Sequence, residues 1–298
     1  MLPDPTLPPI HLGPLTLYPF GILVAIGIML GMWLATRRSE QLGLDPNITN
    51  DVGMWAVIPG FIGAHLVSVI FYTPEKLQTD PLILLKVWEG ISSFGGFFGG
   101  AAGVVYYLYR KRVPFWHYAD ALAYGFAAAW IFGRLGCTVA FDHPGVLTDF
   151  VLGMHYPGGA ASPGVRHNLG FYEALWAVGM FGFFYWQRNT PRVPGWYLVV
   201  FMIAYAPVRF AMDTLRVVDV RYLGLTPGQY AALLLFVWGL YLAWRRSQVD
   251  ERVVPDGKAH VFADGSVAVG KSSSAGGAGQ RPRASHSRTH GAKRKRKK

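Results

Sequence analysis

The chain has 298 residues, of which 52% are hydrophobic and only 15% are charged. This composition excludes an ordinary water-soluble globule, in which about a quarter of the residues are charged, and indicates a protein that crosses a membrane several times. The net charge of +11 comes mostly from residues 249–298, which carry 12 Lys/Arg and 4 Asp/Glu and leave a net +3 on the first 248 residues.

Seven mostly apolar stretches are long enough to cross a hydrocarbon core of roughly 30 Å. We therefore predict an all-α integral membrane protein with seven transmembrane helices. In chain order these spans cover approximately residues 15–35, 52–72, 91–109, 118–140, 168–187, 195–215 and 227–244. The third span contains Gly95-Gly96 and Gly99-Gly100, and such small residues favour close helix packing or irregular backbone beside a cavity.

The loop charges predict the orientation of the spans. Basic residues follow spans 1, 3, 5 and 7, namely Arg37-Arg38, Arg110-Lys111-Arg112, Arg188 with Arg192, and Arg245-Arg246. Because basic loops remain in the cytoplasm, we expect the N-terminus outside and the C-terminus inside. The first span lacks a preceding basic segment and a small-residue cleavage site, so we expect it to be retained rather than removed as a signal peptide.

The chain divides into a membrane domain, residues 1–248, and a tail, residues 249–298. The tail is rich in Gly, Ser and Ala and ends in a run of six basic residues, which predicts a disordered cytoplasmic segment. Its charge would attract anionic lipid headgroups. The same charge could bind nucleic acid, but no sequence-specific pattern supports a nucleic-acid partner.

Span 4 ends in Gly133-Arg134-Leu135-Gly136. A guanidinium at this depth costs roughly 2.5 kcal/mol or more, so it should face the protein interior and hold an anion or a carboxylate. The flanking glycines would let another backbone or a lipid headgroup approach closely.

Other charged residues are predicted near the same leaflet. Glu173 lies in the first turns of span 5 and Asp142 directly follows span 4, while Arg209, Asp213 and Arg216 are three to four residues apart on one face of span 6. Together with Arg134 they form a predicted cluster of three arginines and three carboxylates. Such a cluster could hold a lipid phosphate, or it could be a structural ion-pair network that joins spans 4, 5 and 6.

The single cysteine, Cys137, excludes an internal disulfide, and no Cys/His spacing resembles a zinc site. We interpret Cys137 as a small packing residue. Seven spans also occur in retinal-binding photoreceptors, but none of these spans contains the lysine that retinal requires.

A series of motifs resembles the prolipoprotein diacylglyceryl transferase family over about residues 11–247. The family's elements are matched in order by Tyr18-Pro19-Phe20-Gly21, Phe71-Tyr72, Asp80-Pro81, Val87-Trp88-Glu89-Gly90, Asp120 through Gly136, Thr148-Asp149, Tyr156-Pro157, His167 with Phe171-Tyr172-Glu173, and Arg209…Asp213…Arg216. The resemblance implies the family's seven-span topology with an outer N-terminus, in the bacterial cytoplasmic membrane.

The resemblance also implies an activity. Such enzymes transfer the diacylglyceryl group of phosphatidylglycerol to the lipobox cysteine of a preprolipoprotein and release glycerol phosphate, with no metal or soluble cofactor. The resemblance maps Arg134 and Arg209 to catalytic arginines that hold the phosphate, and it maps Asp142 to the acidic residue of the family's arginine motif. Phosphatidylglycerol contacts are implied for Arg134, Arg209, Glu173, Asp213, Gly95, Gly96, Gly133, Gly136, His167, Tyr172 and Arg216.

Several positions depart from the family pattern. The histidine of the family's His-Gly-Gly element is replaced by Phe94, and Cys137 replaces the asparagine that follows the arginine motif. His65, His143 and His167 are therefore candidates for the missing base, with His65 and His143 as catalytic candidates. Alternatively no protein base is needed, because a few per cent of a thiol is already thiolate at neutral pH.

Two alternatives to the transferase remain open at this stage. One is a divergent paralogue that binds anionic phospholipid without the transfer reaction, and the other is a transporter of an anionic lipid or solute. The expected partners are phosphatidylglycerol, lipobox signal peptides and membrane lipids, and we expect a monomer.

Overall fold

The computed structural model describes residues 1–13, 15–86, 90, 92–219 and 221–253, together with the two-residue strands β6 (His260–Val261) and β7 (Val267–Ala268). Residues 87–89 of the predicted Val-Trp-Glu-Gly element and most of the predicted tail lie outside the described residues.

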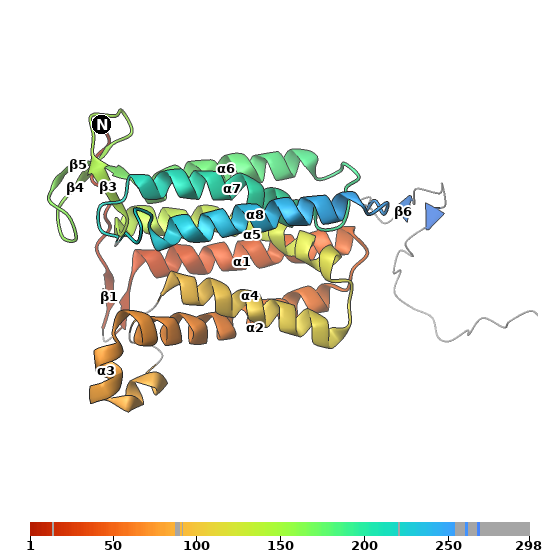
Figure 1. The fold of residues 1–298 in the computed structure, drawn as a ribbon, viewed down its shortest axis with the longest axis horizontal. Coiled ribbons are helices and arrows are strands. Elements are labelled where there is room, and N and C mark those ends of the chain that lie inside the picture. The colour runs from red at the N-terminus through yellow and green to blue at the C-terminus, as the bar shows by residue number, and fades with distance from the viewer. Residues whose placement is uncertain are drawn as a thin grey trace, which may run out of the picture.

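Seven long helices lie side by side in the described part of the chain (Figure 1). They are α1 (Pro19–Gln41), α2 (Pro46–Val67), α4 (Ser93–Lys111), α5 (Phe115–Ala140), α6 (Leu169–Gln187), α7 (Trp196–Thr214) and α8 (Pro227–Ser247). Each overlaps one predicted span. Four of them, α1, α2 with its extension to Phe71, α5 and α7, are long and apolar enough to cross a membrane.

α1 ends six residues after its predicted span, and α2 begins six residues before its own. The residues there are polar and carry no hydropathy signal. The helix begins instead at a capping site, where the Asp45 carboxylate accepts a 2.9 Å hydrogen bond from the backbone N–H of Asn47 and Pro46 occupies the first turn.

Short elements connect α2 to α4. The chain continues from α2 as a π-helix, η1 (Ser68–Tyr72), and then forms α3 (Pro74–Thr79) and the 3-10 helix η2 (Pro81–Leu85). In Figure 1 these elements lie at the same end of the bundle as β1.

The prediction of an all-α chain was wrong in its detail, because the protein is mostly helical but contains short strands. The connection between α5 and α6 includes β3 (Pro144–Leu147), β4 (Met154–Tyr156) and β5 (Gly164–Asn168) in an antiparallel sheet of order β3-β5-β4. A second pair is formed by β1 (Ile10–Leu12) and β2 (Leu15–Leu17). These strands have three to five residues each, too few for a clear alternating pattern.

Glycines bring α2 and α4 into direct backbone contact. A Cβ atom on Gly95, Gly99 or Gly103 would overlap the backbone carbonyl oxygen of Gly63, Pro59 or Trp55, respectively. The predicted role of the glycine-rich span in close packing is therefore confirmed for Gly95 and Gly99.

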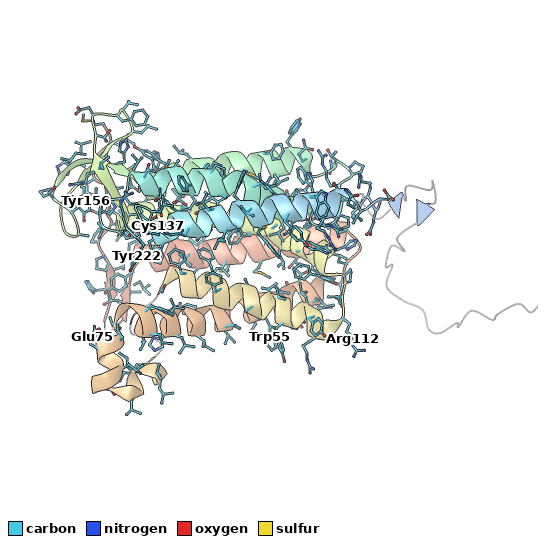
Figure 2. All side chains as sticks on the ribbon, in the orientation of Figure 1. Trp55, Glu75, Arg112, Cys137, Tyr156 and Tyr222 are labelled. Carbon is cyan, nitrogen blue, oxygen red and sulfur yellow. The ribbon has the colours of Figure 1, made fainter. Side chains whose placement is uncertain are left out.

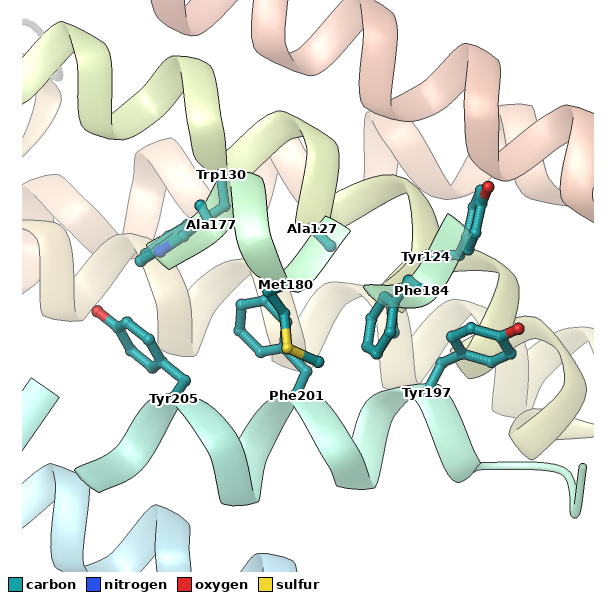
Figure 3. Close-up of a cluster of buried hydrophobic side chains, with 10 residues drawn as sticks. Tyr124, Ala127, Trp130, Ala177, Met180, Phe184, Tyr197, Phe201 and Tyr205 are labelled. Atoms are coloured by element: carbon teal, nitrogen blue, oxygen red, sulfur yellow. The ribbon is translucent and has the colours of Figure 1, made fainter. Parts of the chain in front are cut away.

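An aromatic core joins α5, α6 and α7. Figure 3 shows Tyr124, Trp130, Phe184 and Tyr205 within this cluster, and Trp130 meets Tyr205 edge-to-face with 5.5 Å between ring centroids. This packing fixes the relative positions of the three helices that carry Arg134, Glu173 and Arg209.

The packed chain extends beyond the predicted boundary at residue 248. Val253 is 8% exposed and packs with Leu42 and Ala121, and its backbone exchanges hydrogen bonds with Arg192 at 2.8 and 3.3 Å. Glu251 contacts His117 at 2.9 Å. The segment up to Val253 is therefore part of the helical domain.

Truncation after Gln248 is expected to lower the thermal midpoint by roughly 3–6 °C relative to truncation after Val253. Burial of the valine side chain contributes about 1.5 kcal/mol, which corresponds to that shift in a domain of this size. The measurement is thermal unfolding of both shortened proteins in the same detergent. Equal midpoints would show that residues 249–253 contribute nothing to stability.

Candidate functional site

Of the six charged residues predicted to converge, five form one ion-pair network at one end of the bundle, between α5, α6 and α7, whereas Asp142 pairs with His143. Arg134 lies in the last third of α5, Glu173 in the second turn of α6, and Arg209 and Asp213 one turn apart near the end of α7. Arg216 follows α7 directly. The predicted shared helical face of span 6 is confirmed, because Asp213 contacts both Arg209 and Arg216.

Glu173 is shared by two arginines. Its Oε2 atom lies 3.0 Å from Arg134 Nε and its Oε1 atom lies 2.9 Å from Arg209 Nη1. The Tyr205 hydroxyl donates a third hydrogen bond to Oε2 at 2.8 Å. The Glu173 side chain is 1% exposed, so one buried carboxylate fixes both guanidinium groups at once.

Asp213 is the second buried carboxylate and is completely inaccessible to solvent. Its Oδ1 atom lies 2.9 Å from Arg209 Nη2 and 3.7 Å from Arg216 Nη1. Its Oδ2 atom accepts a 2.7 Å hydrogen bond from Thr226 Oγ1, and Thr226 is the N-cap of α8. The capping residue therefore links the start of α8 to the arginine cluster.

Gly228, in the first turn of α8, lies against the same carboxylate. A Cβ atom at this position would overlap Asp213 Oδ2 and would lie 3.1 Å from Arg209 Nη2. The absence of a side chain thus allows Asp213 to reach both Arg209 and Thr226.

Gly228→Ala is expected to destabilise the protein by about 1–3 kcal/mol, because the added methyl group must displace a buried, ion-paired carboxylate. Gly179→Ala in α6 is the matched control, since its Cβ would have no neighbour within 4 Å, and it should be neutral or slightly stabilising. Thermal unfolding of the two variants measures the difference. A Gly228→Ala protein as stable as Gly179→Ala would mean that Asp213 can relax without cost.

Arg134 is held by more than its carboxylate. Its guanidinium carbon lies 4.3 Å from the centroid of the Trp130 ring, its Nη2 atom lies 3.4 Å from the Tyr205 hydroxyl, and its Nη1 atom lies 3.9 Å from the Cys137 sulfur. The side chain is 12% exposed. A planar cation that stacks and donates in several directions matches this setting better than a lysine would.

The buried ion-pair network consists of the guanidinium groups of Arg134, Arg209 and Arg216 and the carboxylates of Glu173 and Asp213. Its net charge is therefore +1. Asp219, whose side chain is 26% exposed, pairs with Arg216 at 2.9 Å at the rim. The cluster is therefore nearly neutral yet rich in N–H donors, which suits an anionic group.

The predicted glycines occupy different environments. A Cβ on Gly133 would have no neighbour within 4 Å, whereas one on Gly136 would touch the Phe20 ring of α1. Gly95 faces the backbone of α2, and a Cβ on Gly96 would lie at an ordinary 3.7 Å from Ala64. Their predicted contacts with lipid remain predictions.

The candidate histidines lie in three places. His65 is 1% exposed, and its ring nitrogens lie 2.8 Å from the Ile83 carbonyl oxygen and 3.4 Å from that of Gly90, so it ties α2 to the following loop. His143 pairs with its neighbour Asp142. His143 lies three residues after the end of α5, the helix that carries Arg134.

His167 and Tyr172 contact each other. His167, in β5, has its Nδ1 atom 2.9 Å from the Tyr172 hydroxyl, and Tyr172 donates to the Leu152 carbonyl at 3.4 Å. Burial lowers the pKa of His167 below its ordinary value, because desolvation disfavours the charged imidazole. The neutral form therefore predominates at pH 7.

Sequence reasoning missed Trp130, Tyr205, Asp219, Thr226 and Gly228. Helical spacing could have indicated two of them, because Trp130 precedes Arg134, and Tyr205 precedes Arg209, by four residues on the same helix face. Asp219 pairs with Arg216, three residues earlier in the chain, whereas the contacts of Thr226 and Gly228 depend on the packing of α8 against α7, which no local pattern reveals.

An apolar helical bundle with a buried arginine–carboxylate cluster at one end is typical of a membrane protein with a polar site in its interior. The chain belongs to the prolipoprotein diacylglyceryl transferase family, whose model matches residues 9–245. The resemblance of the motifs is thereby confirmed.

Similar proteins share most of their length with this chain. The phosphatidylglycerol–prolipoprotein diacylglyceryl transferase of Chromohalobacter salexigens is 30% identical over 262 residues, 84% of this chain and 97% of its own. The enzyme of that name from Nitratidesulfovibrio vulgaris is 31% identical over 262 residues, 84% of this chain and 98% of its own. One of two such enzymes from Streptomyces coelicolor, the one numbered 1, is 30% identical over 282 residues, 91% of this chain and 82% of its own.

Proposed function

We propose that this protein transfers the diacylglyceryl group of phosphatidylglycerol to the thiol of the lipobox cysteine in a preprolipoprotein and releases glycerol phosphate. The observation that carries the proposal is the carboxylate of Glu173 shared between Arg134 and Arg209, in a chain of this transferase family. The relatives are named for phosphatidylglycerol and prolipoprotein, and both belong to the proposed reaction.

The two arginines hold the phosphate of the lipid. Each guanidinium has five N–H groups, and the contacts with Glu173, Tyr205 and Asp213 engage only some of them. The carboxylates thus orient the guanidinium groups, while the remaining donors face a phosphate oxygen. Arg216 extends the site toward the rim, where a headgroup can approach.

The chemical step replaces a C–O bond by a C–S bond. The sulfur electron pair of the acceptor thiolate attacks the glycerol carbon that carries the phosphate ester, and the bond from that carbon to the phosphate oxygen breaks. Glycerol phosphate leaves with the electron pair of that bond. Arg134 and Arg209 stabilise the charge that develops on the leaving phosphate, which is the main electrostatic task of such a site.

The membrane arrangement belongs to the same proposal. The seven long helices cross the bacterial cytoplasmic membrane with the N-terminus outside, so that the arginine cluster lies in the outer half and the basic ends of α1, α4, α6 and α8 face the cytoplasm. The protein acts as a monomer, and the basic tail stays near anionic lipids of the inner leaflet.

A second candidate is a paralogue that binds phosphatidylglycerol without transferring it. It is favoured by one observation, the replacement of the histidine in the family's His-Gly-Gly element by Phe94. It keeps the arginine cluster but lacks that source of thiol activation.

The test uses the purified full-length protein in liposomes, phosphatidylglycerol labelled in its acyl chains, and a lipobox peptide. Transfer of the label to the peptide, together with release of glycerol phosphate in equal amount, is expected. A peptide with serine in place of the lipobox cysteine is the control and should remain unlabelled. If the wild-type protein binds the lipid but labels no peptide, the transferase is excluded and the paralogue is favoured.

A further inference from the structure

Three potential metal-binding side chains meet just beyond the arginine cluster. The sulfur of Cys137, a carboxylate oxygen of Asp142 and a ring nitrogen of His143 all lie within 4.8 Å of one another. Ligand atoms around a tetrahedral zinc ion are about 3.5 Å apart, because zinc binds nitrogen and sulfur at roughly 2.0–2.3 Å. Small side-chain adjustments would therefore place an ion between the three groups.

The fold holds these residues on firmly packed elements. At the end of α5, Phe141 has a left-handed φ of 45° and is 2% exposed, with its ring centroid 4.8 Å from that of Tyr156. This turn directs Asp142 and His143 back toward the last turn of the helix, where Cys137 lies. Figure 2 shows Cys137 and Tyr156 at the same end of the bundle.

The neighbouring residues support the same geometry. Pro144, directly after His143, pairs with Asn168 as β3 joins β5, and the Asn168 side chain donates a 3.1 Å hydrogen bond to the carbonyl of Thr138, next to Cys137. A site supported by strand pairing and a helix end keeps its ligands in place.

We propose that Cys137, Asp142 and His143 bind a zinc ion whose open fourth position takes the thiol of the acceptor cysteine. This inference rests on the proposed function for the identity of that thiol. A thiolate, an imidazole and a carboxylate are ligands that zinc prefers, and three protein ligands with one open position are typical of a reactive zinc site. The sequence spacing alone did not indicate a metal, because two of the ligands follow the helix end.

The charges of the three ligands suit a zinc ion, and they must also offset the repulsion between the metal and the nearby Arg134 guanidinium. The two anionic ligands, Cys137 and Asp142, balance the charge of the zinc ion, so the complex is neutral with three protein ligands. Coordination of an acceptor thiolate adds one negative charge. Arg134, whose Nη1 atom lies 3.9 Å from the Cys137 sulfur, then faces that charge.

The proposed zinc site lies next to Arg134, one of the two arginines proposed to bind the lipid phosphate. Because Cys137 contacts the arginine that holds the leaving phosphate, an acceptor sulfur bound at the zinc lies beside the lipid headgroup. A zinc-bound thiol is deprotonated, and its proton passes to solvent at the exposed side of Asp142, which has a side-chain exposure of 43%. The sulfur electron pair would then form the C–S bond as the C–O bond to the phosphate breaks, so that glycerol phosphate leaves with that electron pair and the neutral thioether no longer binds the metal strongly.

The zinc site would account for two departures from the family pattern at once. At position 94 the family's histidine is replaced by phenylalanine, and at position 137 the asparagine that follows the arginine motif in the family is replaced by cysteine. Activation of the acceptor by the metal would replace activation by the absent histidine.

Metal binding is tested first, without lipid or peptide. The full-length protein is stripped with a chelator and titrated with Zn²⁺, and with Co²⁺ as a spectroscopic probe. We expect one equivalent of tightly bound metal and a thiolate-to-cobalt charge-transfer band. A wild-type protein without that band would overturn the site, whether or not any variant folds.

Single variants then identify the ligands. Cys137→Asn, Asp142→Asn and His143→Gln should each weaken zinc binding at least tenfold, and Cys137→Asn introduces the residue that the family motif carries. His155→Gln, at an exposed position of β4, is the matched control and should bind zinc as the wild type does. Unchanged zinc stoichiometry and affinity in Cys137→Asn would mean adventitious metal only.

The transfer assay separates the role of the metal from the proposed function itself. Stripped protein should lose most of its transfer activity, and Zn²⁺ or Co²⁺, but not Mg²⁺, should restore it. If stripped protein transfers at the full rate, zinc does not activate the thiol, although the transferase stands. If zinc-loaded protein shows no transfer, the proposed function and the thiol role both fail, although the metal site stands.

Discussion

Replacing Arg134 or Arg209 with alanine is expected to lower the rate of diacylglyceryl transfer by a factor on the order of 10²–10³, the usual cost of losing one preorganised donor at a developing negative charge. Both side chains are held in place before any lipid binds, through the shared carboxylate of Glu173. Each substitution therefore removes a charge that needs no reorganisation in the transition state.

Lysine at either position should restore only part of the activity. An ammonium group cannot donate two parallel hydrogen bonds to a phosphate, as a guanidinium group can. At position 134 it would also lose the stacking on Trp130, which lies 4.3 Å from the guanidinium carbon. Arg134→Lys is therefore expected to be more harmful than Arg209→Lys.

The measurement is a single-turnover assay with labelled phosphatidylglycerol and a lipobox peptide. Arg221→Ala is the matched control, because the Arg221 guanidinium contacts only backbone carbonyls of Gly224 and Thr214 among its described hydrogen bonds and is exposed. Its transfer rate should stay within a few-fold of the wild type. An Arg134→Ala or Arg209→Ala protein that keeps more than a tenth of the wild-type rate would contradict the proposal that these two arginines hold the lipid phosphate.

The arginine cluster shows what the sequence could and could not predict. The spacing of Arg209, Asp213 and Arg216 predicts one helical face, because residues three and four apart are neighbours on any helix, and these ion pairs are present. The pairing of Arg134 and Arg209 with a carboxylate also follows from the cost of an unpaired charge in hydrocarbon. That both arginines share Glu173 depends on how three helices pack, which no local pattern contains.

The same distinction applies to the fold. Long apolar stretches predict the helices well, since hydrophobicity over about 20 residues is a strong signal. The sheet of β3, β5 and β4 was missed because its pairing is non-local and its strands are short. Composition also does not reveal that Val253, which follows the predicted boundary at residue 248, packs against Leu42.

Glu173→Ala is expected to destabilise the protein by about 3–5 kcal/mol, because it leaves two buried guanidinium groups without their shared carboxylate. The side chain is 1% exposed and accepts from Arg134, Arg209 and Tyr205, so water cannot easily take its place. Of the single substitutions considered, this one should have the largest effect on stability.

Glu173→Gln tests whether the negative charge or the shape of the Glu173 side chain stabilises the protein. All three groups that face Glu173 are donors, whereas glutamine offers one acceptor oxygen and an NH₂ group that is itself a donor. One arginine would therefore face a donor in either orientation of the amide. The glutamine variant should lose nearly as much stability as Glu173→Ala, while Tyr205→Phe, which removes a single donor to the carboxylate, should lose only about 1.5–3 kcal/mol.

A double variant distinguishes loss of the ion pair from loss of packing. If Glu173→Ala is destabilising because of unpaired guanidinium groups, adding Arg209→Met should restore part of the stability, since it removes one buried charge and keeps an unbranched apolar side chain. Unfolding of the single and double variants in lipid nanodiscs measures this coupling. If the double variant loses as much stability as the sum of the two single variants, the carboxylate and the arginine act independently, and the cluster around Glu173 is not the unit that positions both arginines.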